Sequence, residues 1–376
     1  MDFLQIPLRH GKKGQGKRLT TARDSVPVWH VRAYEDGDIE AAAQLYEAVY
    51  GRPLHGDYYR WKLVETPWSL SAPNIWLADA GDRLAGHYAA TPLRFKLENE
   101  ILTIGHTGDA MTHPDFRRQG IFTTVASTAH EAWTAAGVPF MVGVPNERWL
   151  SRRGPLGYRE QFKLAWFWRP LRPGRLLARR FGLPGQLQWL AALAGRFLLA
   201  VSNFKLRVAG DTRVTTVSRP GPLFDTLWQR LQAHYPALYV RDRAWLVYRY
   251  VDIPRHGYRI FLAWRAESPA GYIVYRLTTV GQQRTGWIAD LFTAPHDRAT
   301  QAALLRMALD DMIAAGADTA RMLLSPEAPL AHMVRRAGFW RARGEFDASL
   351  VALNGPLPDL STAESWFTMA GDYDIV

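Results

Sequence analysis

The chain has 376 residues, of which 48% are hydrophobic, and its formal charge is +11. This length suffices for two buried cores, since a domain commonly takes about 150 residues. The sequence contains no cysteine, which excludes disulfides, thiolate metal sites and a cysteine nucleophile, and fits a cytoplasmic protein. No apolar run of about 18 residues and no signal-peptide core are seen, so we expect neither a spanning helix nor export.

Residues 1–27 are rich in Gly, Lys and Arg and are predicted to form a basic flexible arm. Residues 39–50 carry apolar side chains at helical spacing, which predicts an amphipathic helix. Residues 74–80 and 84–92 are predicted strands joined by Gly81-Asp82-Arg83, a typical hairpin turn. A further strand pair is predicted within residues 93–104, around Glu98-Asn99-Glu100.

The next segment has the pattern of a phosphate-binding turn. A β-like run ends near Thr112, a basic turn reaches Gly120, and a helix is predicted over residues 121–136. Glycine lets backbone N–H groups approach a ligand closely, and the first N–H groups of a helix have no partner within the helix. They also lie at the positive end of the helix dipole, which favours a pyrophosphate. An ordinary surface turn carrying two arginines is the alternative.

The same segment resembles the acyl-CoA-dependent N-acyltransferases of the GNAT superfamily. Their signature is Gln or Arg, two residues, Gly, one residue, then Gly or Ala; Arg117 and Gly120 match it, whereas Phe122 departs from it. A predicted strand over residues 138–144 and the word Leu156-Gly157-Tyr158 also match. The resemblance implies an acyl-CoA co-substrate, acetyl-CoA or another, and no metal. The implied cofactor contacts are Ala110, Met111, Thr112, Arg117, Arg118, Gln119, Gly120, Ile121, Phe122, Thr123 and Asn146.

An internal repeat is the second informative feature. Pro254 follows Pro67 by 187 positions, and similar words recur in the same order at slowly drifting offsets, as loop insertions and deletions produce. Further pairs are Trp76 with Phe261, Gly86 with Gly271, Asp109 with Asp290, Pro114 with Pro295, Gly137 with Gly316, and Gly157 with Gly338. A helix over residues 302–315 and a strand over 319–324 are predicted in the second copy.

The second copy has Gln301 where the first has the close-approach Gly120. We therefore expect a degenerate second domain that binds no CoA and helps to shape the acceptor cleft. The predicted fold is α/β (an α+β mixed sheet) with two GNAT-like domains in tandem. The predicted domains are a basic arm (1–27), an N-terminal GNAT domain (28–162), a basic and aromatic helical linker (163–212) and a degenerate GNAT-like domain (213–376).

The positive charge has three explanations: attraction to CoA phosphates, to nucleic acid or to anionic lipid. No nucleic-acid recognition motif is seen, so that partner is not favoured. The predicted linker combines Trp166, Phe167 and Trp168 with several arginines, which is the composition of a helix at a membrane surface. The alternative is a linker helix packed on either domain with solvated arginines. The first interpretation implies a cytoplasmic protein bound peripherally to the inner face of the plasma membrane.

For acyl transfer, an amine must lose a proton and an oxyanion must be stabilised. By resemblance to the superfamily, backbone N–H groups of residues 110–112 would hold the acyl carbonyl. A carboxylate on that strand is a frequent base, which makes Asp109 the candidate, with His113 beside it as base or relay. A structural Asp in a half-buried strand and a plain polar His are the alternatives. At the superfamily's usual Tyr acid position this chain has Arg153, which cannot serve as an acid.

The chain ends with Trp366 and a Gly-Asp-x-Asp stretch, Gly371 to Asp374. A subgroup of tandem GNAT proteins from bacterial cell-surface polysaccharide pathways ends in this way, so the resemblance implies an amino-sugar acceptor. The predicted function is therefore N-acyl transfer, acetyl in the first instance, from acyl-CoA to an amine. The alternative is a non-catalytic module that binds acyl-CoA or assembles at a membrane surface.

Overall fold

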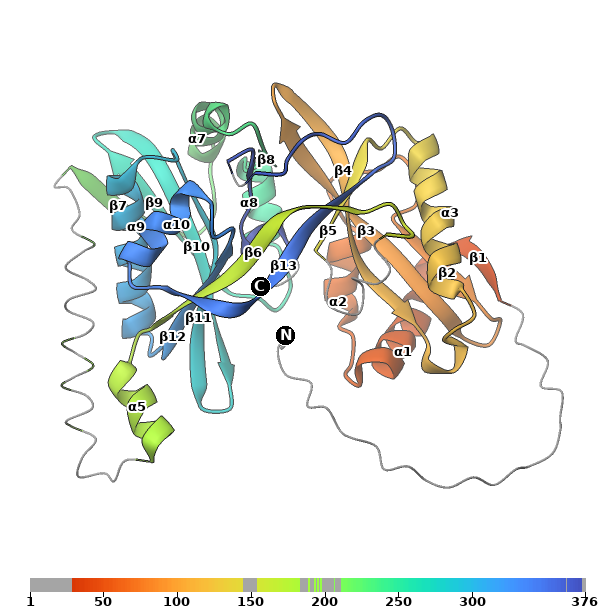
Figure 1. The fold of residues 1–376 in the computed structure, drawn as a ribbon, viewed down its shortest axis with the longest axis horizontal. Coiled ribbons are helices and arrows are strands. Elements are labelled where there is room, and N and C mark those ends of the chain that lie inside the picture. Colours follow the sequence, from red (N-terminus) through yellow and green to blue (C-terminus); the bar gives the residue numbers. More distant parts are fainter. Residues whose placement is uncertain are drawn as a thin grey trace.

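Figure 1 shows the computed structural model, in which one continuous mixed sheet joins two halves that carry helices on their faces. The structure describes residues 29–144, 154–182, 189, 193, 195, 197, 206, 211–362 and 364–373. The predicted arm 1–27, Asn146 and Arg153 lie outside these residues, as does most of the segment 183–210. The predicted α/β fold with a mixed sheet is confirmed.

The first half comprises residues 29–170. Its helices are α1 (Ile39–Tyr50), α2 (Gly56–Tyr59), a π-helical turn η2 (Arg60–Val64) and α3 (Ile121–Ala135), with short 3-10 turns at Asp36–Asp38 and Pro114–Phe116. Its strands are β1 (His30–Ala33), β2 (Ile75–Asp79), β3 (Leu84–Leu97), β4 (Glu100–Thr112), β5 (Phe140–Gly143) and β6 (Arg159–Pro170). The predicted helix 39–50 is therefore confirmed at both ends, and the predicted hairpins are confirmed to within a few residues.

The second half repeats this order of elements. Its strands are β7 (Thr212–Val217), β9 (Tyr258–Arg265), β10 (Ser268–Val280), β11 (Gln283–Thr293), β12 (Thr319–Leu324) and β13 (Trp340–Ala352). Its helices are α7 (Leu223–Leu231), α8 (Arg243–Tyr250), α9 (Arg298–Ala314) and α10 (Pro329–Arg336), with 3-10 turns at Gln232–His234 and Ala370–Asp372. The short strands β8 (Ala237–Tyr239) and β14 (Trp366–Phe367) pair with each other, and β8 also pairs with β3. Helix α5 (Pro173–Phe181) follows β6.

The two halves exchange their last long strands. The sheet order is β1-β2-β3-β4-β5-β13-β6-β12-β11-β10-β9-β7, so β13 of the second half lies between β5 and β6. Strand β6 of the first half pairs in turn with β12 over Ala165–Pro170. All three contacts are antiparallel, with Leu350 opposite Val142 and Phe346 opposite Leu164. Separating the halves would therefore break strand pairs, not only side-chain contacts.

The predicted helical linker is wrong for residues 163–170, which belong to strand β6 (Figure 1). Trp166 and Phe167 are buried in the core, and Arg169 is 1% exposed and donates to the Ala337 carbonyl at 2.6 Å. A run of aromatic residues fits a strand that is covered on both faces, and this tertiary context outweighs the helical spacing. These aromatic residues are therefore not available to a membrane, and the helix begins only at Pro173.

A reciprocal contact joins the halves at η2 and α8. The Trp61 indole N–H donates to the Tyr248 carbonyl at 3.1 Å, and the Tyr248 hydroxyl donates to the Trp61 carbonyl at 3.2 Å. Their rings stack with centroids 4.8 Å apart. This contact therefore links η2 of the first half directly to α8 of the second half.

Buried ion pairs fix the C-terminal segment in the second half. Arg241 lies between Asp290 and Asp372, with N–O distances of 3.1 and 2.6 Å, and all three side chains are fully buried. Burial raises the pKa of Asp290 above its ordinary value although Arg241 opposes this effect. The Tyr272 hydroxyl donates to Asp290 at 2.8 Å. The Gly-Asp-x-Asp stretch noted in the sequence thus has a structural role through Asp372.

Candidate active site

Strands β4 and β5 separate after a short parallel contact, which leaves one edge of β4 open. They pair only at Gly105 with Met141 and at His106 with Val142, whereas β4 pairs with β3 along most of its length. Beyond His106, β4 runs on to Thr112 with no strand of the described chain on this edge. The opening lies beside the turn that leads into α3 (Figure 1).

The predicted phosphate turn has the backbone shape that anion binding requires. Arg118 and Gly120 both have positive φ, +68° and +77°, and the α3 helix starts directly after them at Ile121. No side chain forms a hydrogen bond that caps this end of the helix. The first N–H groups of α3 thus have no side-chain cap, and the exposed Arg117 and Arg118 lie next to them in the chain.

The equivalent helix terminus in the second half is closed. Asp297 caps α9, where its carboxylate accepts from the Thr300 backbone N–H at 3.1 Å and from the Thr300 hydroxyl at 2.6 Å. A carboxylate thus lies at the place that a phosphate would take, and it satisfies donors that an anion needs. The start of α3 therefore has no side-chain cap, whereas the start of α9 is capped by Asp297.

Asp109 lies at an irregularity in β4. Its φ is +50°, and the register of β3 against β4 shifts between His87 and Ala89. The Asp109 carboxylate accepts from the Lys62 ammonium group at 2.7 Å, and its backbone carbonyl contacts His87 Nδ1 at 2.7 Å. Asp109 thus joins η2, β3 and β4, and its side chain is 26% exposed.

The other predicted residues have more varied surroundings. His113 Nδ1 accepts from the Asp115 backbone N–H at 3.3 Å, and its ring packs on Phe116, so this side chain shapes the turn. Met111 is buried, which leaves only its backbone for a ligand. The Phe122 ring meets the edge of Tyr88 at 6.0 Å, so packing accounts for the departure from the GNAT signature. Along the open edge and the turn, Ala110, Thr112 and Gln119 are half-buried, Thr123 is exposed and Ile121 is buried.

A buried hydrogen-bonded chain beneath the open edge was not predicted. The Thr107 hydroxyl donates its hydrogen to the Val142 carbonyl at 3.0 Å. Because that hydrogen is used, the Tyr158 hydroxyl is the donor in its contact with Thr107, also at 3.0 Å. The Tyr88 hydroxyl lies 3.2 Å from that of Tyr158 and 3.0 Å from His130 Nε2. If His130 carries its hydrogen on Nε2, each group donates to the next one along the chain, through Tyr88, Tyr158 and Thr107 to the Val142 carbonyl. The sequence signal was Tyr158 in the Leu-Gly-Tyr word, and its partners come from other elements.

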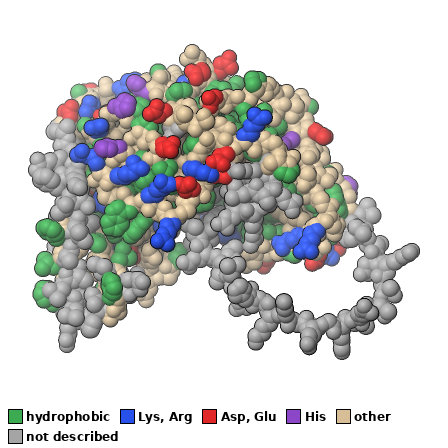
Figure 2. All heavy atoms as spheres, viewed as in Figure 1, with side chains coloured by type: hydrophobic (Ala, Val, Ile, Leu, Met, Phe, Trp, Pro, Cys, Tyr) green, Lys and Arg blue, Asp and Glu red, His purple; other side chains and the backbone are tan. Residues whose placement is uncertain are grey.

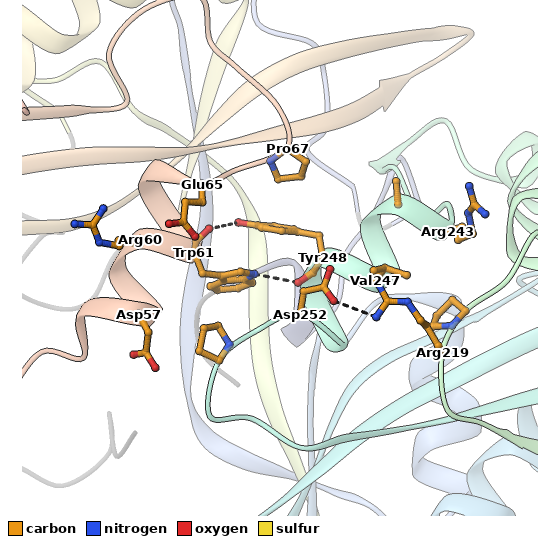
Figure 3. A pocket seen from close by; sticks show the side chains of 13 residues that line it. Asp57, Arg60, Trp61, Glu65, Pro67, Arg219, Arg243, Val247, Tyr248 and Asp252 are labelled. Carbon is orange, nitrogen blue, oxygen red and sulfur yellow. Dashed lines mark hydrogen bonds and ion pairs between the residues drawn. The ribbon is translucent and has the colours of Figure 1, made fainter. Parts of the chain in front are cut away.

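A second hollow lies between the halves, at the Trp61–Tyr248 contact (Figure 3). It has a volume of about 770 Å³ and includes both acidic and basic side chains, among them the Arg219–Asp252 pair at 3.3 Å. Neither Asp109 nor the phosphate turn lines it. Among the described residues, no group of three or more His, Asp or Glu side chains is arranged to hold a metal ion.

The family comparison agrees with this geometry. A sequence model described as an acetyltransferase (GNAT) domain matches residues 30–159, which include β4, the phosphate turn and β5. Residues 30–159 are thus similar to GNAT acetyltransferase domains. A search of curated proteins finds no match to this sequence.

Solved structures share the fold over most of the chain. A GCN5-related N-acetyltransferase from Anabaena variabilis has 14% identity and a TM-score of 0.62, and covers 87% of this chain and 73% of its own. A probable N-acyltransferase from Enterococcus faecalis has 11% identity and a TM-score of 0.61, and the match covers 86% of this chain and 72% of that protein. Saccharomyces cerevisiae N-myristoyltransferase, solved with myristoyl-CoA, has 11% identity and a TM-score of 0.59, with 88% and 85% covered. These similarities define the fold.

His130 should make the folded state sensitive to acid. Burial lowers its pKa to about 4, whereas the ordinary value is 6.5. Between these values the unfolded chain binds a proton that the folded chain does not, so stability falls as the pH falls through this window. We expect wild type to lose about 2 kcal/mol more than His130→Gln between about pH 7 and about pH 4.5.

Urea unfolding at the two pH values measures this difference. His332→Gln, at an exposed histidine of α10, is the control and should keep the pH response of wild type. An equal response in wild type and His130→Gln would show that His130 is not held neutral by its surroundings.

Proposed function

We propose that the first half transfers a short acyl group, acetyl in the first instance, from acyl-CoA to the amine of an amino sugar. The observation that carries this proposal is the uncapped start of α3, opposed to the Asp297-capped start of α9. The second half is then a degenerate copy of the same domain, with boundaries near residues 28–162 and 213–376. Its role is to hold the first half in shape and to border the acceptor cleft.

The chemistry follows from the arrangement along β4. The amine nitrogen attacks the thioester carbon while Asp109 takes its proton, and the resulting oxyanion is held by backbone N–H groups of residues 110–112. The C–S bond then breaks, and the CoA thiolate takes up a proton from solvent. The pyrophosphate lies at Arg117, Arg118 and the first turn of α3. Asn146 and His113 remain candidates for cofactor contact and proton relay respectively.

Gly120→Glu tests whether this turn binds acyl-CoA. The change places a negative charge where the pyrophosphate is proposed to lie, so we expect calorimetry to show loss of acetyl-CoA binding by at least about 100-fold. Gly137→Glu is a matched control, since Gly137 lies just past the other end of α3 with a similar φ of +81°. An added Cβ meets nothing within 4 Å at either glycine.

Equal binding by wild type and Gly120→Glu would exclude the turn as the pyrophosphate site. A wild type that binds neither acetyl-CoA, CoA nor a longer acyl-CoA would contradict the proposed function as a whole.

The surroundings of Asp109 offer a place for the acceptor amine. The carboxylate is paired with Lys62, and its side chain is 26% exposed. Tyr50, at the end of α1, is 38% exposed and close enough for the Asp109 charge to add to the effect of burial, which raises the Tyr50 pKa to about 12. A partly exposed tyrosine ring beside a carboxylate offers a sugar amine both a flat apolar face and a charge partner. By contrast, Tyr58, Tyr59, Trp61 and Tyr88 are core residues.

Asp109→Asn removes the proposed base. We expect kcat with a glucosamine-type acceptor to fall by about 10²- to 10⁴-fold, with acetyl-CoA affinity unchanged, because only proton transfer is lost. Release of free CoA thiol measures the rate. Asp115→Asn, at an exposed carboxylate of the neighbouring turn, should retain wild-type activity. A kcat for Asp109→Asn within threefold of wild type would exclude Asp109 as the base.

We also propose contact with an anionic membrane, through the segment after β6. Four large hydrophobic side chains there are exposed by 61% to 70%: Phe181, Trp189, Leu193 and Phe197. Figure 2 shows hydrophobic side chains standing out at the left edge, whereas Lys and Arg mix with Asp and Glu over the rest of this face. Exposed aromatic residues on a chain with a formal charge of +11 suit a negatively charged lipid surface. No helix of the described residues is long and apolar enough to span a bilayer.

Replacing Trp189 and Phe197 together by Ser should weaken binding to phosphatidylserine-containing vesicles at least about tenfold, because two interfacial anchors are lost. Sedimentation with vesicles measures the bound fraction. Trp340→Ser, at an exposed tryptophan of β13, is the control and should bind as wild type does. Wild type that stays in the supernatant at low salt would exclude this contact.

A further inference from the structure

The backbone at Asp109 adopts a conformation that a non-glycine residue rarely takes. Its φ of +50° lies in the left-handed region, which is unfavourable for a residue with a Cβ unless the surroundings hold it. It coincides with the register shift of β3 against β4. Two buried side chains, those of His87 and Tyr59, stabilise this backbone conformation at the open edge of β4.

His87 and Tyr59 form that support. His87 is 1% exposed, and its Nδ1 lies 2.7 Å from the Asp109 carbonyl, while its Nε2 lies 3.0 Å from the Tyr59 hydroxyl. A carbonyl oxygen only accepts, so Nδ1 carries the hydrogen and donates it to Asp109. In the neutral ring Nε2 is then the acceptor, and Tyr59 donates to it. Burial lowers the pKa of His87, which keeps the ring neutral and this tautomer in place.

The hydrogen bond from His87 determines where the next N–H points. In a trans peptide the carbonyl of one residue and the N–H of the next point in opposite directions. The Asp109 carbonyl is turned toward the His87 imidazole, so the Ala110 N–H of the same peptide points away from that ring. At this level β5 has already left β4, after the His106–Val142 pair.

We propose that His87 is a positioning residue, which aims the Ala110 N–H into the open edge of β4 to donate to the carbonyl of a bound acyl thioester. This inference rests on the proposed function and specifies the donor for the acyl group. Tyr59 supports it by fixing the His87 tautomer. Neither residue belongs to the phosphate turn, since Tyr59 lies at the end of α2 and His87 lies on β3.

Infrared spectroscopy of bound acetyl-CoA labelled with ¹³C at the thioester carbonyl tests this geometry without an acceptor. A hydrogen bond to the carbonyl lowers its stretching frequency, so we expect a lowered frequency in wild type. His87→Leu removes the donor and should abolish the shift. His87→Asn places an amide N–H near the position of Nδ1 and should restore most of it. Calorimetric affinity for CoA without the acetyl group should stay within about twofold across these variants.

A merely structural role for His87 would change thermal stability but leave the carbonyl frequency of the bound thioester as in wild type, and this result would overturn the inference. Tyr59→Phe supplies a second test should His87→Leu not fold. It should reduce the shift and let the ring exchange tautomers, which ¹⁵N NMR of the imidazole detects. An Nε2–H tautomer in wild type would overturn the inference directly. A wild type that binds no acetyl-CoA would instead refute the proposed function, and this inference with it.

Discussion

The pairing of β5 with β13 is the constraint on which the candidate site depends. Strand β5 has only four residues, Phe140 to Gly143, and all four pair with Ser349 to Ala352 at the end of β13. On its other edge β5 pairs with β4 at two positions, and from Thr107 onward no described strand pairs with this edge of β4. A strand from the second half thus holds the outer edge of β5, next to the candidate site in the first half.

The same exchange places charge differently in the two halves. In the first half, Lys62 and Asp109 form a partly exposed pair at the open edge. In the second half, Asp290 is fully buried against Arg241, and Asp372 from the C-terminal segment covers the same arginine. Burying ionised groups is tolerated only when they are paired and hydrogen bonded, so this cluster serves architecture and has no room for a substrate. Asp109 is therefore partly exposed, whereas Asp290 is a buried structural group.

The segment after Gly157 shows where sequence patterns mislead. Its aromatic and basic residues have the composition of an interfacial helix, yet residues 159–170 form the exchanged strand β6. Local spacing does not distinguish the two, because a strand covered on both faces also carries large apolar residues at successive positions. Arg169 illustrates the difference: its charge suggested solvent or lipid, but its guanidinium is buried and bound to the Ala337 carbonyl.

Local patterns predict the helix over residues 39–50, the strand pairs and the turn at Gly120, because these features depend on short-range periodicity and on backbone freedom at a glycine. The Asp297 cap of α9 is local as well, since Asp297 binds Thr300 three residues further on. The exchange of strands between the halves and the contacts of His87, Tyr59 and Lys62 around Asp109 follow from the tertiary structure alone. They join residues that are tens to hundreds of positions apart, and they arise from sheet order and burial, which no local pattern encodes.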